Sequence, residues 1–393
     1  MKPRELKPDI YSIGAVDWDR RLFDELIPLP DGTSYNSYLV KGSEKTALID
    51  TVDPTMGDVL IKNLNQLDIK DIDYIIVNHA EQDHSGYLPQ IIDAYPDAKV
   101  VTNPKCKALL RDLLAIPENK FITVDDGGIL SLGDKTLEFI YAPWVHWPET
   151  MLTYLREDRI LFPCDLFGSH LATSDLYVTD EATVYESAKR YYAEIMMPFR
   201  TTLQKNLEKI KDLEIDLIAP SHGPIYANPK FILEAYRHWV LDLPDNTVVV
   251  PYVSMHGSTK EMVDYFVGAL TERGITVKQF KLSNTDIGKL AMTLVDAATV
   301  VMGVPTTLAG AHPLAFYAAY LVKVLRPKLK FVSIIGSYSW GGKAVEQLAE
   351  IISSLDVEIL DPVYCKGFPR TKDFESLDKL ADTIYKKHQE MSL

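Results

Sequence analysis

The chain has 393 residues, of which 47% are apolar and 24% charged, and its formal net charge is −14. The length exceeds one ordinary hydrophobic core and predicts two domains, and the composition excludes a disordered chain. Because nucleic acids and anionic membrane surfaces repel so acidic a chain, neither is an expected partner. No run of about 18 apolar residues occurs, so no membrane span is expected.

The three cysteines, Cys106, Cys164 and Cys365, are widely separated and form no C-x-x-C pair. This spacing excludes a cysteine-ligated zinc or rubredoxin-type iron module within the chain and argues against a disulfide framework. The first residues are charged and contain no apolar segment typical of a signal peptide. We therefore expect a cytoplasmic location.

The first part of the chain is rich in strands, with helical patterns between them. This order predicts an α/β domain of packed sheets flanked by helices. The strands are expected at residues 34–40, 46–50, 74–78, 100–102, 121–124, 136–141, 151–155 and 159–163, and the helices at 56–67, 87–94, 104–114 and 181–212.

The pattern changes at residues 241–246, where a helical stretch ends and an apolar strand begins. We place the domain boundary there, which gives domains 1–245 and 246–393. In the second domain, strands alternate with helices, which predicts a doubly wound, five-stranded parallel sheet with ligands bound at the carboxyl ends of its strands. The strands are expected at 247–253, 275–282, 298–304, 331–336 and 357–360.

Candidate metal ligands follow the apolar strand at 74–78. His79, Glu81, Asp83 and His84 lie within six positions, and in an extended or turning loop the first three can face one way while His84 turns to a second metal. One histidine in a loop is more often structural than a ligand. Three further strand ends also supply candidates, however, so the set as a whole predicts a metal site. These further candidates are His146, Asp165 and His222.

The ligand types narrow the choice of metal. Imidazole with carboxylate suits iron, manganese or zinc, and Asp165 has two oxygens with which to bridge two ions. Three carboxylates offset much of the charge of two divalent ions and favour oxidation beyond the divalent state. The ligand set therefore favours a redox-active iron pair, with zinc as the alternative.

Three loops at strand ends of the second domain consist of small and hydroxyl-bearing residues. Such loops offer backbone N–H groups and hydroxyls to a phosphate and let a flavin ring approach closely, although one such turn alone can simply cap a helix. None has the Walker A or G-x-G-x-x-G order. The candidate residues are Ser254, Met255, His256, Gly257, Ser258, Thr259, Pro305, Thr306, Thr307, Leu308, Ala309, Gly310, Ser337, Tyr338, Ser339, Trp340, Gly341 and Gly342.

The spacing of the candidate metal ligands resembles that of the metallo-β-lactamase superfamily, whose hydrolytic members usually carry histidine at the position of Glu81. Glu81, the His146-Trp-Pro-Glu-Thr-Met segment and the Asp165-Leu-Phe-Gly-Ser-His segment together resemble the flavodiiron protein family. The resemblance covers essentially the whole chain, and the three loops resemble the FMN site of flavodoxin. It implies a metallo-β-lactamase-like αβ/βα sandwich followed by a flavodoxin-like domain.

The resemblance also implies the role of each ligand. One iron is expected on His79, Glu81 and His146, and the other on Asp83, His84 and His222, with Asp165 bridging. Tyr191 matches a tyrosine that the family places near the irons, and His170 is expected nearby as a supporting residue. Two positions depart from the family: Asp24 stands where many members have histidine, and His256 stands where an aromatic residue is frequent.

The expected function is that of an oxidoreductase that takes O₂ to water with four electrons, NO to N₂O, or both. Two iron ions and FMN are the expected cofactors, with electrons from rubredoxin or reduced coenzyme F420. A head-to-tail homodimer or a dimer of dimers is the expected assembly. The alternative is a binuclear zinc hydrolase with an appended flavodoxin domain. A basic cluster, Lys323, Arg326, Lys328 and Lys330, is either a docking site for an acidic donor or a solvated helix end.

Overall fold

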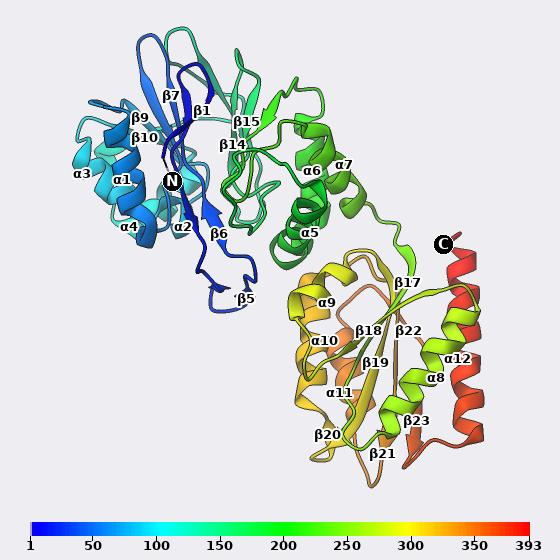
Figure 1. Cartoon of the computed structure of the whole chain (residues 1–393). Helices are drawn as coiled ribbons and strands as arrows, with labels where there is room; N and C mark the ends of the chain where they lie inside the picture. The colour runs from blue at the N-terminus through cyan, green and yellow to red at the C-terminus, as the bar shows by residue number, and fades with distance from the viewer. Residues whose placement is uncertain (1) are drawn as a thin grey trace. The chain divides into compact units, whose positions relative to one another are not determined.

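The computed structural model describes residues 2–393, which divide into two compact units (Figure 1). The first unit comprises the residues up to Tyr192 together with Phe199–Val240, and the second comprises Ala193–Pro198 and Leu241–Leu393. Among the described residues, no helix is both long and apolar enough to cross a membrane.

The first unit is built on two facing sheets. The larger sheet has the order β1-β2-β7-β8-β9-β10-β11 and the smaller the order β12-β13-β14-β15-β16. The larger contains β1 (Arg4–Lys7), β2 (Ile10–Ser12), β7 (Tyr38–Lys41), β8 (Thr46–Ile49), β9 (Tyr74–Ile76), β10 (Lys99–Thr102) and β11 (Phe121–Thr123). The smaller contains β12 (Ile129–Ser131), β13 (Thr136–Tyr141), β14 (Met151–Leu155), β15 (Ile160–Phe162) and β16 (Leu217–Ile218).

Short strands and helices complete this unit. Two small ribbons pair β3 (Ala15–Asp17) with β6 (Thr33–Tyr35) and β4 (Leu22–Phe23) with β5 (Ile27–Pro28). The α-helices are α1 (Gly57–Gln66), α2 (Gln82–Ser85), α3 (Leu88–Ala94), α4 (Pro104–Leu114), α5 (Glu181–Tyr191), α6 (Arg200–Ile210) and α7 (Pro229–Val240). Short 3₁₀ turns lie at Pro54–Met56, Glu118–Lys120 and Met197–Phe199, and a π-helical turn lies at Tyr192–Met196.

Strand β9 shows why the sheets stack. Ile76 points into the core between the two sheets, and Ile75 points into the core between the larger sheet and helices α1, α3 and α4. A strand covered on both faces is apolar throughout and does not alternate with polar residues. Figure 1 shows α1, α3 and α4 outside one sheet and α5, α6 and α7 outside the other, which confirms the predicted αβ/βα sandwich.

The helix expected at 181–212 is in fact two helices. α5 and α6 are separated by the π-helical and 3₁₀ turns between Tyr192 and Phe199. Pro198 lies in this break, and a proline has no N–H for a helical hydrogen bond and disfavours helical geometry in the residue before it. The single-helix prediction was therefore wrong at this point.

The second unit has one parallel sheet with the order β18-β17-β19-β21-β22, which confirms the predicted doubly wound fold. Its fifth position is split between two short strands, β22 and β23, and β20 pairs antiparallel with β19. The strands are β17 (Asp245–Tyr252), β18 (Thr276–Lys281), β19 (Ala297–Thr307), β20 (Gly310–Ala311), β21 (Phe331–Tyr338), β22 (Glu358–Ile359) and β23 (Val363–Lys366).

Helices cover both faces of this sheet. Figure 1 shows α8 and α12 on one face and α9, α10 and α11 on the other, and a core of buried apolar side chains from β17, β19 and β21 packs against α8 and α12. The helices are α8 (Ser258–Glu272), α9 (Ile287–Leu294), α10 (Pro313–Leu325), α11 (Ala344–Ile352) and α12 (Thr371–Glu390). The central strands are buried on both faces, so their carboxyl ends are the open part of the unit.

Candidate functional site

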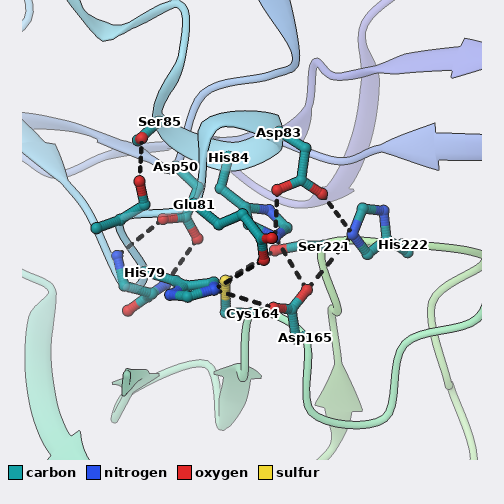
Figure 2. A network of polar contacts seen from close by, with 12 residues as sticks. Asp50, His79, Glu81, Asp83, His84, Ser85, Cys164, Asp165, Ser221 and His222 are labelled. Atoms are coloured by element: carbon teal, nitrogen blue, oxygen red, sulfur yellow. Dashed lines mark hydrogen bonds and ion pairs between the residues drawn. The ribbon is translucent and has the colours of Figure 1, made fainter. Parts of the chain in front are cut away.

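The two facing sheets of the first unit each contribute candidate ligands to one cluster. His79 follows β9 of the larger sheet, whereas Asp165 follows β15 and His222 follows β16 of the smaller sheet. His146 lies in the loop between β13 and β14. Figure 2 shows six of the seven predicted ligands, all except His146, pointing toward one another.

The first group of ligands surrounds Glu81. Its Oε2 lies 3.2 Å from His79 Nε2 and 3.0 Å from His146 Nε2. One ligand atom from each of these three residues and one from Asp165 lie within 4.8 Å of one another. Two imidazoles and two carboxylates at this separation can hold one metal ion.

The second group surrounds Asp83. Its Oδ2 lies 3.1 Å from His222 Nε2 and its Oδ1 lies 3.3 Å from His84 Nε2. Asp83 and His84 are on the single turn of α2, so the loop is helical at this point instead of extended, and both residues face the same group. His84 therefore lies at the second group, as expected. Asp83 also faces this group, so the expectation from the loop pattern that it faces the same way as His79 and Glu81 was wrong, and its position agrees with the family resemblance.

Asp165 divides its two oxygens between the groups. Oδ2 lies 3.6 Å from both His79 Nε2 and His146 Nε2. Oδ1 lies 2.9 Å from His84 Nε2 and 3.4 Å from His222 Nε2. This is the arrangement that a carboxylate bridging two ions requires.

Several ligand atoms lack a hydrogen bond although they are buried. Both Asp83 carboxylate oxygens, His84 Nε2 and Asp165 Oδ2 have no hydrogen-bond partner among residues 2–393. Buried polar atoms without partners are costly unless they bind an ion. The donor set therefore fits a pair of metal ions.

The imidazoles also control the charge of the carboxylates. Burial alone raises the pKa of Asp165, but His84 and His222 lower it well below its usual value. Burial likewise acts to raise the pKa of Glu81, and hydrogen bonds from His146 and His79 lower it. Both groups are therefore anionic, as metal ligands must be.

The other predicted site residues surround the second group. Tyr191 Oη donates a hydrogen bond of 2.8 Å to Asp165 Oδ1. His170 packs its ring 4.8 Å from those of Tyr191 and His222, and its Nδ1 lies 2.8 Å from Thr33 Oγ1. Burial lowers the pKa of His170 well below its usual value, so the ring is neutral. Both residues support the cluster from outside.

Asp24, where the chain departs from the family pattern, lies in the tight turn between β4 and β5 with a φ of 51°. Partial burial and the charges of Glu81 and Asp83 raise its pKa. The neighbouring Phe23 packs its ring 5.1 Å from that of His170. The ribbon therefore presents Asp24 near the ligand cluster.

In the second unit, a cavity of about 80 Å³ lies at the carboxyl ends of β17, β19, β21 and β23. All three predicted loops contribute to it. It is lined by Ser254, Met255, His256, Ser258, Thr259, Pro305, Thr306, Ser337, Tyr338, Ser339 and Gly367.

The cavity begins at the N-terminus of α8. Gly257 is the N-cap with a φ of 95°, a conformation that favours glycine, and the buried Thr259 Oγ1 lies 3.3 Å from Ser337 Oγ. Free N–H groups at a helix start attract an anion. The loop is therefore suited to a phosphate group.

Some predicted cofactor residues lie outside the lining of this cavity. β19 continues to Thr307 and turns through Leu308 and Ala309 into β20, which leaves Leu308 91% exposed, and Trp340 is 70% exposed. The remaining such residues are Gly257, Gly310, Gly341 and Gly342. Gly367 was missed because β23 is a short strand whose end the sequence did not mark.

The basic cluster is not a continuous surface. Lys328 is only 2% exposed, and its Nζ lies 3.7 Å from Asp296 Oδ1. A buried lysine cannot contact a docking protein. The hypothesis of a four-residue docking site was therefore wrong for Lys328.

Comparisons with known proteins place both units in families. Residues 33–223 match the ODP family beta lactamase, and residues 250–377 match flavodoxin. The chain is 36% identical to a nitric oxide reductase of Moorella thermoacetica, with 91% of this chain and 92% of the relative covered. It is 33% identical to a coenzyme F420H₂ oxidase of Methanothermobacter marburgensis, with 97% and 98% covered.

Solved structures agree with these relatives. The rubredoxin oxygen:oxidoreductase of Desulfovibrio gigas superposes with a TM-score of 0.94 at 29% identity, with 99% of each chain covered. The flavodiiron protein of Giardia intestinalis superposes with a TM-score of 0.92 at 27% identity, with 100% of this chain and 98% of that chain covered. The chain belongs to the flavodiiron protein family.

Proposed function

We propose that the chain is an oxidoreductase that reduces O₂ to water, NO to N₂O, or both, with FMN relaying electrons to a pair of iron ions. The observation that carries the proposal is the position of Asp165, whose two oxygens face two separate groups of buried ligands. A flavodoxin domain in the same chain gives this metal pair a source of electrons. A hydrolase has no evident use for a source of electrons.

The residues fit both cofactors. One iron is held by His79, Glu81 and His146 and the other by Asp83, His84 and His222, with Asp165 between them. When bound, the iron pair and the reduced flavin each supply two electrons, and the sum is the four that O₂ and four protons need to form two waters. Two electrons and two protons convert two NO into N₂O and water.

The protein contributes to the reaction by holding the ligands in fixed positions and by excluding water from the site. The ligands follow short strands of two packed sheets, and five of the seven are buried, so small substrates meet a fixed, largely dry centre. Tyr191 fixes the orientation of Asp165 through its hydrogen bond. His170, held by Thr33, fills the space behind His222.

For FMN, the turn that starts α8 receives the phosphate group, with Ser258 and Thr259 supplying N–H groups and hydroxyls. The loops after β19 and β21 receive the flavin ring, with Thr306 and Ser337 in the cavity wall. The exposed Trp340 is available to flank the ring. The diiron domain covers residues 1–245 and the FMN domain 246–393.

The external electron donor is rubredoxin or reduced coenzyme F420, which appear in the names of two of the similar proteins. The assembly is a head-to-tail homodimer or a dimer of dimers, which analytical ultracentrifugation tests. The three cysteines of the described chain are free and buried, which supports a reducing compartment such as the cytoplasm.

The test is anaerobic reduction followed by pulses of O₂ or NO, with iron and FMN quantified on the same sample. We expect about two irons and one FMN per chain, gas consumption in the electron ratios above, and reoxidation of the flavin. Comparing initial rates for the two gases, and for each donor, identifies the substrate and partner. Glu81→Gln is expected to lower turnover while FMN content stays unchanged.

The zinc hydrolase alternative gives opposite results. It requires two zinc ions per chain, hydrolysis of a thiolester and no consumption of either gas. Those results together would overturn the proposal.

A further inference from the structure

His79 is hydrogen bonded to a buried carboxylate on the side away from the ligand cluster. Its Nε2 faces Glu81, and its Nδ1 donates to Glu149 Oε1 at 2.7 Å. Glu149 Oε1 also accepts from the backbone N–H of Ala80 at 3.0 Å. Two adjacent donors of the ligand loop therefore share one oxygen.

Glu149 is itself held firmly. It is 2% exposed, and Asn103 Nδ2 donates to its backbone carbonyl. The Trp147 ring packs edge-on against the His79 ring at 5.1 Å. The second carboxylate oxygen of Glu149, Oε2, has no hydrogen-bond partner within the described chain. A buried carboxylate satisfied on one oxygen only is costly, which calls for a role that compensates the cost.

The two metal positions have matching ligands but different surroundings. Each has two imidazoles and one carboxylate of its own, and they share Asp165. In the second group, His222 Nδ1 donates to the backbone carbonyl of Ser34 at 2.6 Å, a neutral acceptor. Tyr191 donates to Asp165 Oδ1, the oxygen on that same side, and so draws charge from it.

We propose that Glu149 is a positioning residue that makes the metal position of His79, Glu81 and His146 the higher-affinity one of the two. The carboxylate fixes the proton on Nδ1 and directs Nε2 to the metal, and its charge raises the basicity of the imidazole. The inference rests on the proposed two-metal function. It goes further because it ranks the two positions.

The test uses Glu149→Gln, which keeps the size of the side chain and one acceptor oxygen but removes the charge. Apoprotein of the full chain is titrated anaerobically with Fe²⁺ against a chelator. We expect the tighter of two binding steps to weaken about 10- to 100-fold while the weaker step is unchanged. Single-site backgrounds assign the step: Asp83→Ala leaves the His79 position and Glu81→Ala leaves the His222 position.

Asp50→Asn is the matched control. Asp50 is another buried carboxylate, and it accepts hydrogen bonds of 2.8 and 2.9 Å from Asn78, which is not a predicted ligand. Its loss is expected to lower stability and to leave both metal affinities in place, which thermal unfolding of the apoprotein separates from metal binding. The inference is overturned if Glu149→Gln weakens both steps equally or neither, or if Asp50→Asn weakens the tighter step selectively. Failure of the wild-type chain to bind two ions overturns the proposed function as well.

Discussion

Tyr191 shows how a single atom can matter at the scale of one residue. Its ring is buried, and its hydroxyl donates to Asp165 Oδ1 at 2.8 Å. A hydrogen bond to a charged group contributes about 1.5–3 kcal/mol, so its loss lets Asp165 shift. We expect Tyr191→Phe to lower reductase turnover about 10-fold with iron content unchanged, measured by gas consumption and metal analysis.

Tyr192→Phe is the control for this prediction. Tyr192 is the next residue, and its hydroxyl donates to the backbone carbonyl of Trp239 at 3.2 Å instead of to a ligand. Equal losses of turnover in the two variants would show that the effect of Tyr191 is not exerted through Asp165.

His388 gives the second unit a dependence on pH. It is buried on α12, with Nδ1 2.8 Å from Asn246 Oδ1 and Nε2 2.8 Å from Thr299 Oγ1. Burial lowers its pKa to about 4. In the unfolded chain the pKa is about 6.5, so below that pH the unfolded state binds a proton that the folded state does not.

The contribution of the neutral His388 to the free energy of unfolding is therefore fully present above about pH 6.5. It is lost as the pH drops toward 4, which lowers the free energy of unfolding by up to about 3 kcal/mol. In His388→Gln this part of the pH dependence should disappear. Urea unfolding between pH 4.5 and 7.5 measures the difference from the wild-type chain. His256→Gln changes an exposed histidine of the same unit and should show the same pH dependence of stability as the wild-type chain. If the difference in stability between the wild-type chain and His388→Gln did not vary with pH, His388 would not be the source of this pH dependence.

The sequence predicted the candidate metal ligands better than the residues that hydrogen bond to them. His79, Asp165 and His222 each follow an apolar strand, so their positions could be predicted from local pattern. Glu149 lies 70 positions from His79, and no local pattern marks a contact over that separation. Its role became visible only when the fold brought the two residues together.

At the scale of helices and strands, long elements could be predicted from the sequence and very short ones could not. Long buried strands such as β19, with eleven residues, are apolar runs that pattern alone identifies. Strands β1–β5 are two to four residues long and were not predicted, because so few residues show no period. Short strands depend on pairing partners that are distant in sequence.

Helix α4 and the loop before β14 are joined by one side chain, Asn103. Its Oδ1 accepts from the N–H groups of Lys105 and Cys106 at 3.0 and 2.9 Å, and its Nδ2 donates to the carbonyl of Glu149. Asn103→Ala removes the helix cap and leaves that carbonyl unpaired. We expect it to reduce the free energy of unfolding by about 2 kcal/mol, measured with urea.

Asn103→Asp separates the two contributions. The carboxylate keeps the cap but cannot donate to Glu149, so a loss between those of the wild type and the alanine variant is expected. An aspartate variant as stable as wild type would show that the contact with Glu149 contributes nothing.

Across the whole molecule, the candidate metal ligands come from parts of the chain that lie far apart in sequence. His79 comes from the larger sheet of the first unit, and Asp165 and His222 come from the smaller one. An ion held by both sheets stabilises the folded unit and not the unfolded chain. The flavin cavity in the second unit likewise draws on loops from four strands.

Removing each cofactor should therefore destabilise one unit selectively. A ligand present at about 1,000 times its Kd contributes about 4 kcal/mol, which corresponds to roughly 10 °C in a unit of this size. We expect two transitions in calorimetry: a chelator lowers one, and removal of FMN lowers the other. Restoring iron alone or FMN alone should restore only the matching transition. A single transition that responds equally to both treatments would show that the two units unfold as one body and would contradict the division near residue 245.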